Sequence, residues 1–218
     1  MSEMRTEEEQ VEALKSWWKE NGRSLLLGIA LALAAVFGWK GWQNNQQVTA
    51  ENASVVYQNL VQAVALASAP QSTDDQRTTA THLAKSLKDE FGDTAYARFG
   101  ALFSARLYAD SGDYAAALGE LDWVLAQAPD DVMKTVATMR KARVMAAMGD
   151  ADKAVLLLDG LNTASFSVSV AELKGDLYLQ LGQVDKARDA YQVAVAAAPQ
   201  GARPLLSLKL DNLAVKGS

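Results

Sequence analysis

The sequence predicts an all-α protein in which a single transmembrane helix precedes an α-solenoid of stacked helix pairs. Sixteen consecutive residues without a charge, mostly apolar, run from Ser24 to Trp39. The chain after them is rich in helix-forming Ala, Leu, Lys and Gln, and the whole sequence has only 4 prolines. Its C-terminal half repeats a short glycine-containing pattern at nearly constant spacing, which is typical of stacked helical repeats.

The first 23 residues are expected to form a cytoplasmic segment with a short juxtamembrane helix. Val11, Leu14 and Trp18 recur at helical spacing, so they favour a helix lying at the headgroup level of a bilayer. A solvated lead-in to the anchor is the alternative. Asn21-Gly22 is a helix-breaking pair, so we expect a break there, with Ser24 capping the next helix.

Residues 24–42 are predicted to span the membrane. The uncharged stretch is about 24 Å long as a helix, slightly short of a ~30 Å hydrocarbon core, and flanking Arg23 and Lys40 can snorkel to the interface. Four tryptophans suit the interfacial belts: Trp17, Trp18, Trp39 and Trp42. Small residues offer a contact face to another membrane helix: Gly28, Ala32, Ala35 and Gly38.

Basic residues predict the orientation of this helix. The segment before it carries six acidic and four basic residues, unlike the cationic start of a cleaved signal peptide. Four Lys or Arg precede the helix, whereas only Lys40 follows it before Arg77. The positive-inside rule places the N-terminus in the cytoplasm and the long C-terminal part outside, which is the periplasm if the membrane is a Gram-negative inner membrane.

Residues 43–92 are expected to form a helical arm that caps the repeats. Val56, Leu60 and Val64 are spaced four apart and form one apolar stripe. The composition of residues 68–74 predicts a loop, and a second helix is expected over residues 75–91. Thr94 is expected to cap the helix that follows.

Residues 93–218 contain the repeats and a last capping helix over residues 205–215. Turn glycines Gly112, Gly149 and Gly182 lie 37 and 33 residues apart, near the ~34-residue period of helix-turn-helix repeats. The repeats resemble the tetratricopeptide motif, although its first Trp and Leu are missing. The matching positions are Ala105, Tyr108, Ala117, Leu121 and Pro129 in the first unit, Ala142, Met145, Ala154 and Leu158 in the second, with Phe166 in place of the proline, and Gly175, Tyr178, Ala187, Tyr191 and Pro199 in the third.

The first helix of each repeat is expected to line a groove that binds a partner. The groove would be apolar, with Arg106 and Arg143 at one end and acidic residues at the other. Its candidate residues are Phe99, Leu102, Arg106, Val136, Met139, Arg143, Ser169, Glu172 and Asp176. The alternative is that most of the apolar members are core residues, because apolar side chains at helical spacing are usually buried.

Composition and motifs disfavour several classes of function. The net charge is −5 with no Lys/Arg-rich block, which argues against nucleic-acid binding, and there is no cysteine to form a disulfide or a thiolate metal site. The single histidine, His82, has no neighbours that complete a triad or a metal site. We therefore expect no cofactor, no metal and no catalysis.

The juxtamembrane segment from Lys15 to Gly22 reads Lys-x-Trp-Trp-x-x-Asn-Gly, and it is joined to the apolar span and degenerate repeats. Together these features resemble the ancillary SecYEG translocon subunit family. The resemblance covers nearly the whole chain. It implies an inner-membrane protein with a periplasmic repeat domain that associates with the SecYEG translocon, with a PpiD-like periplasmic chaperone and with secreted polypeptides. A cell-envelope regulator that sequesters a cytoplasmic signalling protein through Met1–Gly22 is the alternative. The oligomeric state is left open.

Overall fold

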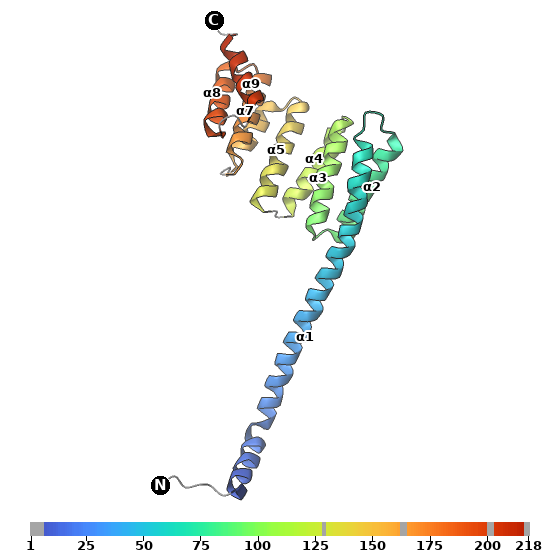
Figure 1. The fold of residues 1–218 in the computed structure, drawn as a ribbon, viewed down its shortest axis with the longest axis vertical. Coiled ribbons are helices and arrows are strands. Elements are labelled where there is room, and N and C mark those ends of the chain that lie inside the picture. The colour runs from blue at the N-terminus through green and yellow to red at the C-terminus, as the bar shows by residue number, and fades with distance from the viewer. Residues whose placement is uncertain (1–6, 128–129, 162–164, 200–202, 216–218) are drawn as a thin grey trace. The chain divides into compact units, whose positions relative to one another are not determined.

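A computed structural model describes residues 7–127, 130–161, 165–199 and 203–215, and within these ranges every regular element is an α-helix (Figure 1). The predicted all-α fold is therefore confirmed. The first six residues and Pro129 lie outside the described residues. The helices are α1 (Glu7–Ala67), α2 (Asp74–Phe91), α3 (Ala95–Asp110), α4 (Tyr114–Ala126), α5 (Asp131–Ala147), α6 (Ala151–Asp159), α7 (Ser167–Gln180), α8 (Val184–Ala197) and α9 (Pro204–Val215).

The chain divides into two units, Met1–Asn52 and Ala53–Ser218. The division falls inside α1, and the helix passes the expected end of the membrane span at residue 42 without a break. The domain boundaries given above therefore stay predictions.

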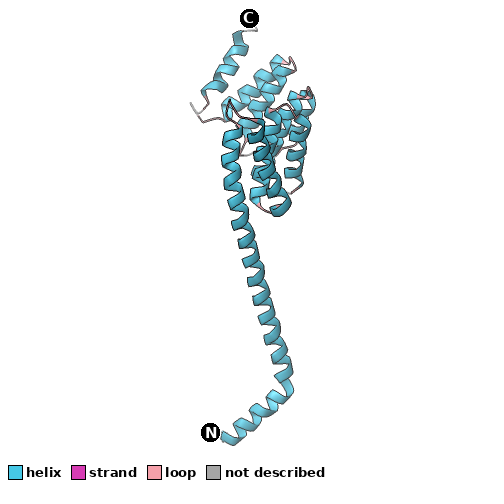
Figure 2. Cartoon of the chain, turned by 90° about the vertical axis from the view of Figure 1, so that its right-hand side faces the viewer, coloured by secondary structure: helices cyan, strands magenta, loops and turns pink. Residues whose placement is uncertain are grey.

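In the first unit, the break expected at Asn21-Gly22 is wrong, because α1 continues through both residues. The Asn21 side-chain amide donates to the Trp17 carbonyl oxygen at 3.2 Å, one turn earlier, so it stays within the helix. The Trp18 ring covers Gly22, where a Cβ would lie 3.2 Å from it. Since one glycine costs a helix only about 1 kcal/mol, good helix formers on both sides carry α1 across it. Near its N-terminal end the helix is bent rather than broken (Figure 2).

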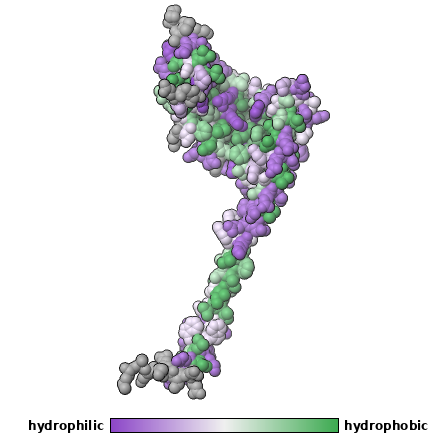
Figure 3. Space-filling model, in the orientation of Figure 1, coloured by the Kyte–Doolittle hydropathy of each residue, from purple (hydrophilic) through white to green (hydrophobic). Residues whose placement is uncertain are grey.

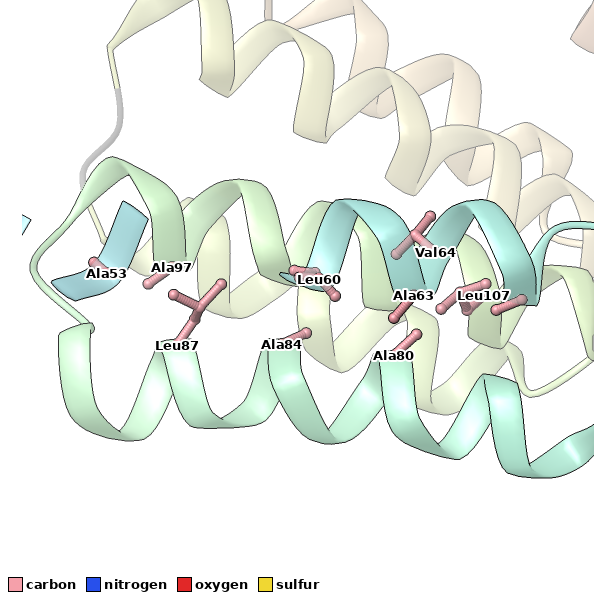
Figure 4. Close-up of a cluster of buried hydrophobic side chains, with 10 residues drawn as sticks. Ala53, Leu60, Ala63, Val64, Ala80, Ala84, Leu87, Ala97 and Leu107 are labelled. Atoms are coloured by element: carbon pink, nitrogen blue, oxygen red, sulfur yellow. The ribbon is translucent and has the colours of Figure 1, made fainter. Parts of the chain in front are cut away.

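In the second unit, the end of α1 packs with α2 and α3. Leu60, Ala63 and Val64 face Ala80, Ala84 and Leu87 of α2 (Figure 4). The apolar stripe predicted for the arm is largely buried, with Leu60 0% exposed and Val64 6% exposed. Thr73 and Gln76 form a capping box that starts α2, and Thr94 caps α3 as expected.

The three repeated turns share one hydrogen-bonding pattern. Gly112, Gly149 and Gly182 have φ of 82°, 96° and 72°, a left-handed conformation that favours glycine. Each turn closes with the two hydrogen bonds of a Schellman motif. In the first, the Gly112 N–H donates to Ala109 O at 3.1 Å and the Asp113 N–H to Tyr108 O at 2.8 Å, and the other two turns repeat both bonds.

Each turn joins the two helices of a pair, namely α3–α4, α5–α6 and α7–α8, and small residues lie where the paired helices cross. Ala105 and Ala142 are buried in the first two pairs, near Leu121 and Leu158 respectively. In the third pair Gly175 replaces the alanine, and the ring of Tyr191 fills the space beside it. Helix α9 closes the stack by burying Leu206 and Leu213 in a cluster with α7 and α8.

Candidate membrane anchor and partner-binding surfaces

An apolar band surrounds α1 in the first unit. Leu27, Leu31 and Phe37 are 66%, 70% and 68% exposed. The most apolar window of the helix has none of its residues buried within the described chain. Figure 3 shows this band between hydrophilic segments of the same helix. Exposing apolar surface to water costs about 25 cal/mol of free energy per Å². The band therefore needs lipid or another protein around it. By length and composition, α1 is the one described helix that could cross a membrane.

Tryptophan pairs flank this band on both sides. Trp17 and Trp18 are 48% and 51% exposed, and Trp39 and Trp42 are 60% and 54% exposed. The rings of Trp39 and Trp42 lie side by side with centroids 5.1 Å apart. The geometry is compatible with interfacial anchoring, which stays a prediction.

The small residues predicted to form a contact face lie on one side of α1. Gly28, Ala32, Ala35 and Gly38 are all exposed, at spacings of four, three and three residues. A Cβ added at Gly28 or Gly38 would meet no atom within 4 Å. Another helix could therefore approach the α1 backbone closely along this face.

In the second unit, the first-helix residues expected to line a groove divide into surface and core. Phe99 on α3 is 41% exposed, and its ring centroid lies 6.1 Å from that of Tyr57 at the end of α1. Leu102 and Met139 are each only 6% exposed and belong to core clusters, and Val136 is half-buried against the first repeat. The apolar part of the predicted groove is thus mostly core, with Phe99 as its exposed member.

Arg106 and Arg143 lie together with a third arginine, Arg140, around a hollow of 260 Å³ between α3 and α5. Its other walls are Ala105, Ala109, Leu121 and Val144. Arg140 donates to the main-chain carbonyl oxygen of Leu102 at 3.0 Å, which ties the second repeat to the first. Burial, and then the positive charges of Arg143 and Arg106, lower the pKa of Arg140. This end of the predicted groove therefore concentrates positive charge.

The predicted acidic end is already covered by α9. Arg203 donates to Glu172 at 2.7 Å and to the Ser169 hydroxyl at 2.8 Å. Lys209 pairs with Glu172 at 3.0 Å and with Asp176 at 2.6 Å. Because Arg203, which directly precedes α9, and Lys209 on α9 neutralise these carboxylates, they offer little free negative charge to a partner.

The same network shifts the pKa values of its members. Burial pushes the pKa of Glu172 up, but hydrogen bonds from Lys209 and Arg203 outweigh it and hold the pKa below its usual value. Burial lowers the pKa of Lys209, but its bonds to Asp176 and Glu172 leave it raised. Burial and the bond to Asp176 raise the pKa of Tyr191. All three shifts favour the charge states that hold α9 against α7.

Two half-buried residues of these surfaces, Arg140 and Tyr57, were not among the residues predicted from the sequence. Arg140 and Arg143 are spaced i, i+3, so their shared helical face was visible in the sequence. Tyr57 lies next to Val56 of the apolar stripe of the arm, and only the packing of α1 on α3 shows that its ring meets Phe99. His82 is exposed on α2, and among the described residues no group of His, Asp and Glu is arranged to hold a metal ion.

Residues 15–215 match a family described as the tetratricopeptide repeat-like domain. The "Ancillary SecYEG translocon subunit" of Escherichia coli is 31% identical over 96% of this chain and 97% of its own length. The protein of the same name from Haemophilus influenzae is 28% identical over 95% of this chain and 97% of its own.

A solved structure supports the fold alone. MamA from Desulfovibrio magneticus RS-1, residue 41 to the end, superposes with a TM-score of 0.56 at 19% identity. The match covers 78% of this chain and 85% of that one. The repeat geometry, the match over almost the whole length and the curated relatives agree: the chain belongs to the ancillary SecYEG translocon subunit family, whose members carry tetratricopeptide repeat-like domains.

Proposed function

We propose that this chain is a non-enzymatic, single-pass scaffold of the inner membrane that docks beside the SecYEG translocon. The observation that carries the proposal is the apolar band of α1, which nothing in the described chain covers, with a face of small residues along it. Its relatives are named for association with that translocon, and the match includes the segment that holds the band. The anchor is then both a tether and a contact surface.

The orientation follows from the basic residues before the span. The N-terminal segment lies in the cytoplasm and the repeat domain in the periplasm, because four Lys or Arg precede the apolar stretch and one follows it closely. In this position the repeats meet polypeptides as they leave the translocon, together with the chaperones that receive them.

The repeat domain supplies a binding surface for a PpiD-like chaperone or for secreted chains. Support comes from the exposed ring of Phe99 beside Tyr57 and from the arginines of α3 and α5. Aromatic rings and arginines are the side chains that most often dominate binding energy at protein interfaces. The acidic end contributes less, because α9 already occupies it.

A matched pair of substitutions tests anchor docking. Ala32→Leu enlarges a residue of the small face, whereas Ala30→Leu makes the same change about 160° away around the helix, since each residue turns ~100°. Both alanines are exposed and neither change removes hydrophobicity. We expect Ala32→Leu to reduce co-purification of the full chain with the translocon in mild detergent, and Ala30→Leu to leave it unchanged. Equal co-purification of both variants would refute docking through this face.

A further inference from the structure

We propose that the hollow between Arg106, Arg140 and Arg143 is a carboxylate-binding subsite for an acidic segment of a polypeptide partner. This deepens the proposed function, on which it rests for the polypeptide nature of the ligand. Arg140 and Arg143 come from one face of α5 and Arg106 from α3, and they enclose 260 Å³. Three guanidinium groups from two helices therefore converge on a space large enough for a carboxylate and the methylene group beside it.

These charges have few partners within the described chain. The Arg106 Nε lies 3.4 Å from the Asp110 carboxylate, in a pair of which both side chains are more than half exposed. The hydrogen bond that the structure gives Arg140 goes to a main-chain carbonyl, and no described carboxylate lies within ion-pair distance of Arg140 or Arg143. Arginine does not relieve mutual repulsion by losing its proton at neutral pH, so a bound anion would offset the repulsion between these charges.

The geometry favours a carboxylate on a polypeptide. Guanidinium groups bind carboxylates through paired, charge-assisted hydrogen bonds, and Arg140 is fixed in advance by its bond to Leu102. The walls of Ala105, Ala109 and Val144 suit the aliphatic part of an acidic side chain.

The exposed ring of Phe99 sets the spacing of the expected ligand. Phe99 and Arg106 are seven residues apart on α3, which places them on one face about 10 Å apart. A polyproline II segment has three residues per turn and rises ~3.1 Å per residue, so its side chains three positions apart lie on one face about 9 Å apart. The expected ligand is therefore a polyproline II segment with an apolar side chain on Phe99 and a carboxylate three positions away.

Peptide binding to the full chain in detergent tests the subsite. The first probe is a short fluorescein-labelled peptide with an amidated C-terminus, carrying Phe and, three positions later, Glu. The second probe replaces that Glu with Gln. The third probe ends at the position of that Glu and has a free C-terminal carboxylate. Fluorescence anisotropy should show the Glu peptide binding at least about tenfold more tightly than the Gln peptide, as a charge-assisted hydrogen bond provides. Tight binding of the third probe would also support the subsite and would identify a chain terminus as a second source of the carboxylate.

Two variants locate the site. Arg143→Gln removes an exposed charge that has no hydrogen-bond or ion-pair partner among the described residues, so it should abolish the preference for Glu over Gln without unfolding the chain. Lys134→Gln removes the same charge from the opposite face of α5 and should keep the preference. Equal binding of the Glu and Gln peptides overturns the subsite. So does a preference that survives Arg143→Gln, or the absence of binding to either carboxylate peptide. If the subsite fails while Ala32→Leu still weakens co-purification with the translocon, only this inference falls.

Discussion

The contact between Gly175 and Tyr191 provides a stringent test of the repeat packing. A Cβ at Gly175 would lie 2.4 Å from Cε1 and 2.5 Å from Cδ1 of the Tyr191 ring, well inside van der Waals contact. The ring cannot easily yield, because it is 0% exposed and its hydroxyl donates to the Asp176 carboxylate at 2.7 Å. Gly175→Ala should therefore force the ring or the helix to shift.

The net effect is the difference between two opposing terms. Alanine gains at most about 1 kcal/mol of helix propensity over glycine. Overpacking a filled core costs about 1–3 kcal/mol, and a contact this short belongs near the upper end. We expect Gly175→Ala to lower the free energy of unfolding by about 1–2 kcal/mol, which in a domain of this size lowers the Tm by about 2–8 °C.

A double mutant separates this clash from other causes. Tyr191→Leu alone should lose about 2–4 kcal/mol, because it leaves a cavity and removes the hydrogen bond from the Tyr191 hydroxyl to Asp176, which keeps its pair with Lys209. Gly175→Ala with Tyr191→Leu recreates the Ala/Leu combination that stands at Ala105/Leu121 and Ala142/Leu158. The two changes should therefore be less destabilising together than the sum of the single effects, by at least about 1 kcal/mol.

Urea denaturation of residues 53–218, followed by circular dichroism, measures all three variants, since this unit contains its own core clusters. Gly119→Ala is the control, because a Cβ there meets nothing within 4 Å in the middle of α4. It should be neutral or stabilising by up to about 1 kcal/mol. Strictly additive effects at positions 175 and 191, or a stabilised Gly175→Ala variant, would refute the packing described here.

Three further predictions concern the turns, the pH dependence and a partly buried ion pair. Gly149→Ala should cost about 1–2 kcal/mol in urea denaturation, because its φ of 96° suits only glycine. The pKa of Glu172 is lower in the folded protein than its unfolded value near 4.5. The resulting stabilisation is fully present above the unfolded pKa and is lost as the pH falls through the folded pKa. The unfolding midpoint should therefore drop in acid, and it should drop less in Glu172→Gln. Glu120→Ala should cost about 2–3 kcal/mol of unfolding free energy, because it leaves Lys88, 2.8 Å away and 19% exposed, without its counter-charge. The exposed Lys85–Asp89 pair is its control, and Asp89→Ala should stay within about 1 kcal/mol.

The features that the sequence predicted well are set by local chemistry. Gly112, Gly149 and Gly182 mark the turns because only glycine adopts their conformation cheaply, and Thr94 caps α3 through its own hydroxyl. Residues close in sequence determine both features. The spacing of the turns then fixes which helices pair, so most of the repeat domain follows from such local signals.

The features that the sequence did not predict depend on contacts between distant residues. Asn21-Gly22 is a break signal in isolation, yet the ring of Trp18 covers Gly22 and α1 continues. Glu172 looks like a free acidic residue on its own helix, and only the return of α9 brings Arg203 and Lys209 onto it. Arg140 gains its importance from a carbonyl 38 residues earlier, which no local pattern reveals.

Docking of α1 beside the translocon through its small-residue face can be examined by crosslinking in the membrane. A photoreactive residue placed at Ala32 of the full chain lies on that face, and one at Ala30 lies on the far side. We expect adducts with a translocon subunit from Ala32 and far fewer from Ala30. Adducts of equal yield from both positions, or none with the translocon from any position between Leu25 and Gly38, would contradict it.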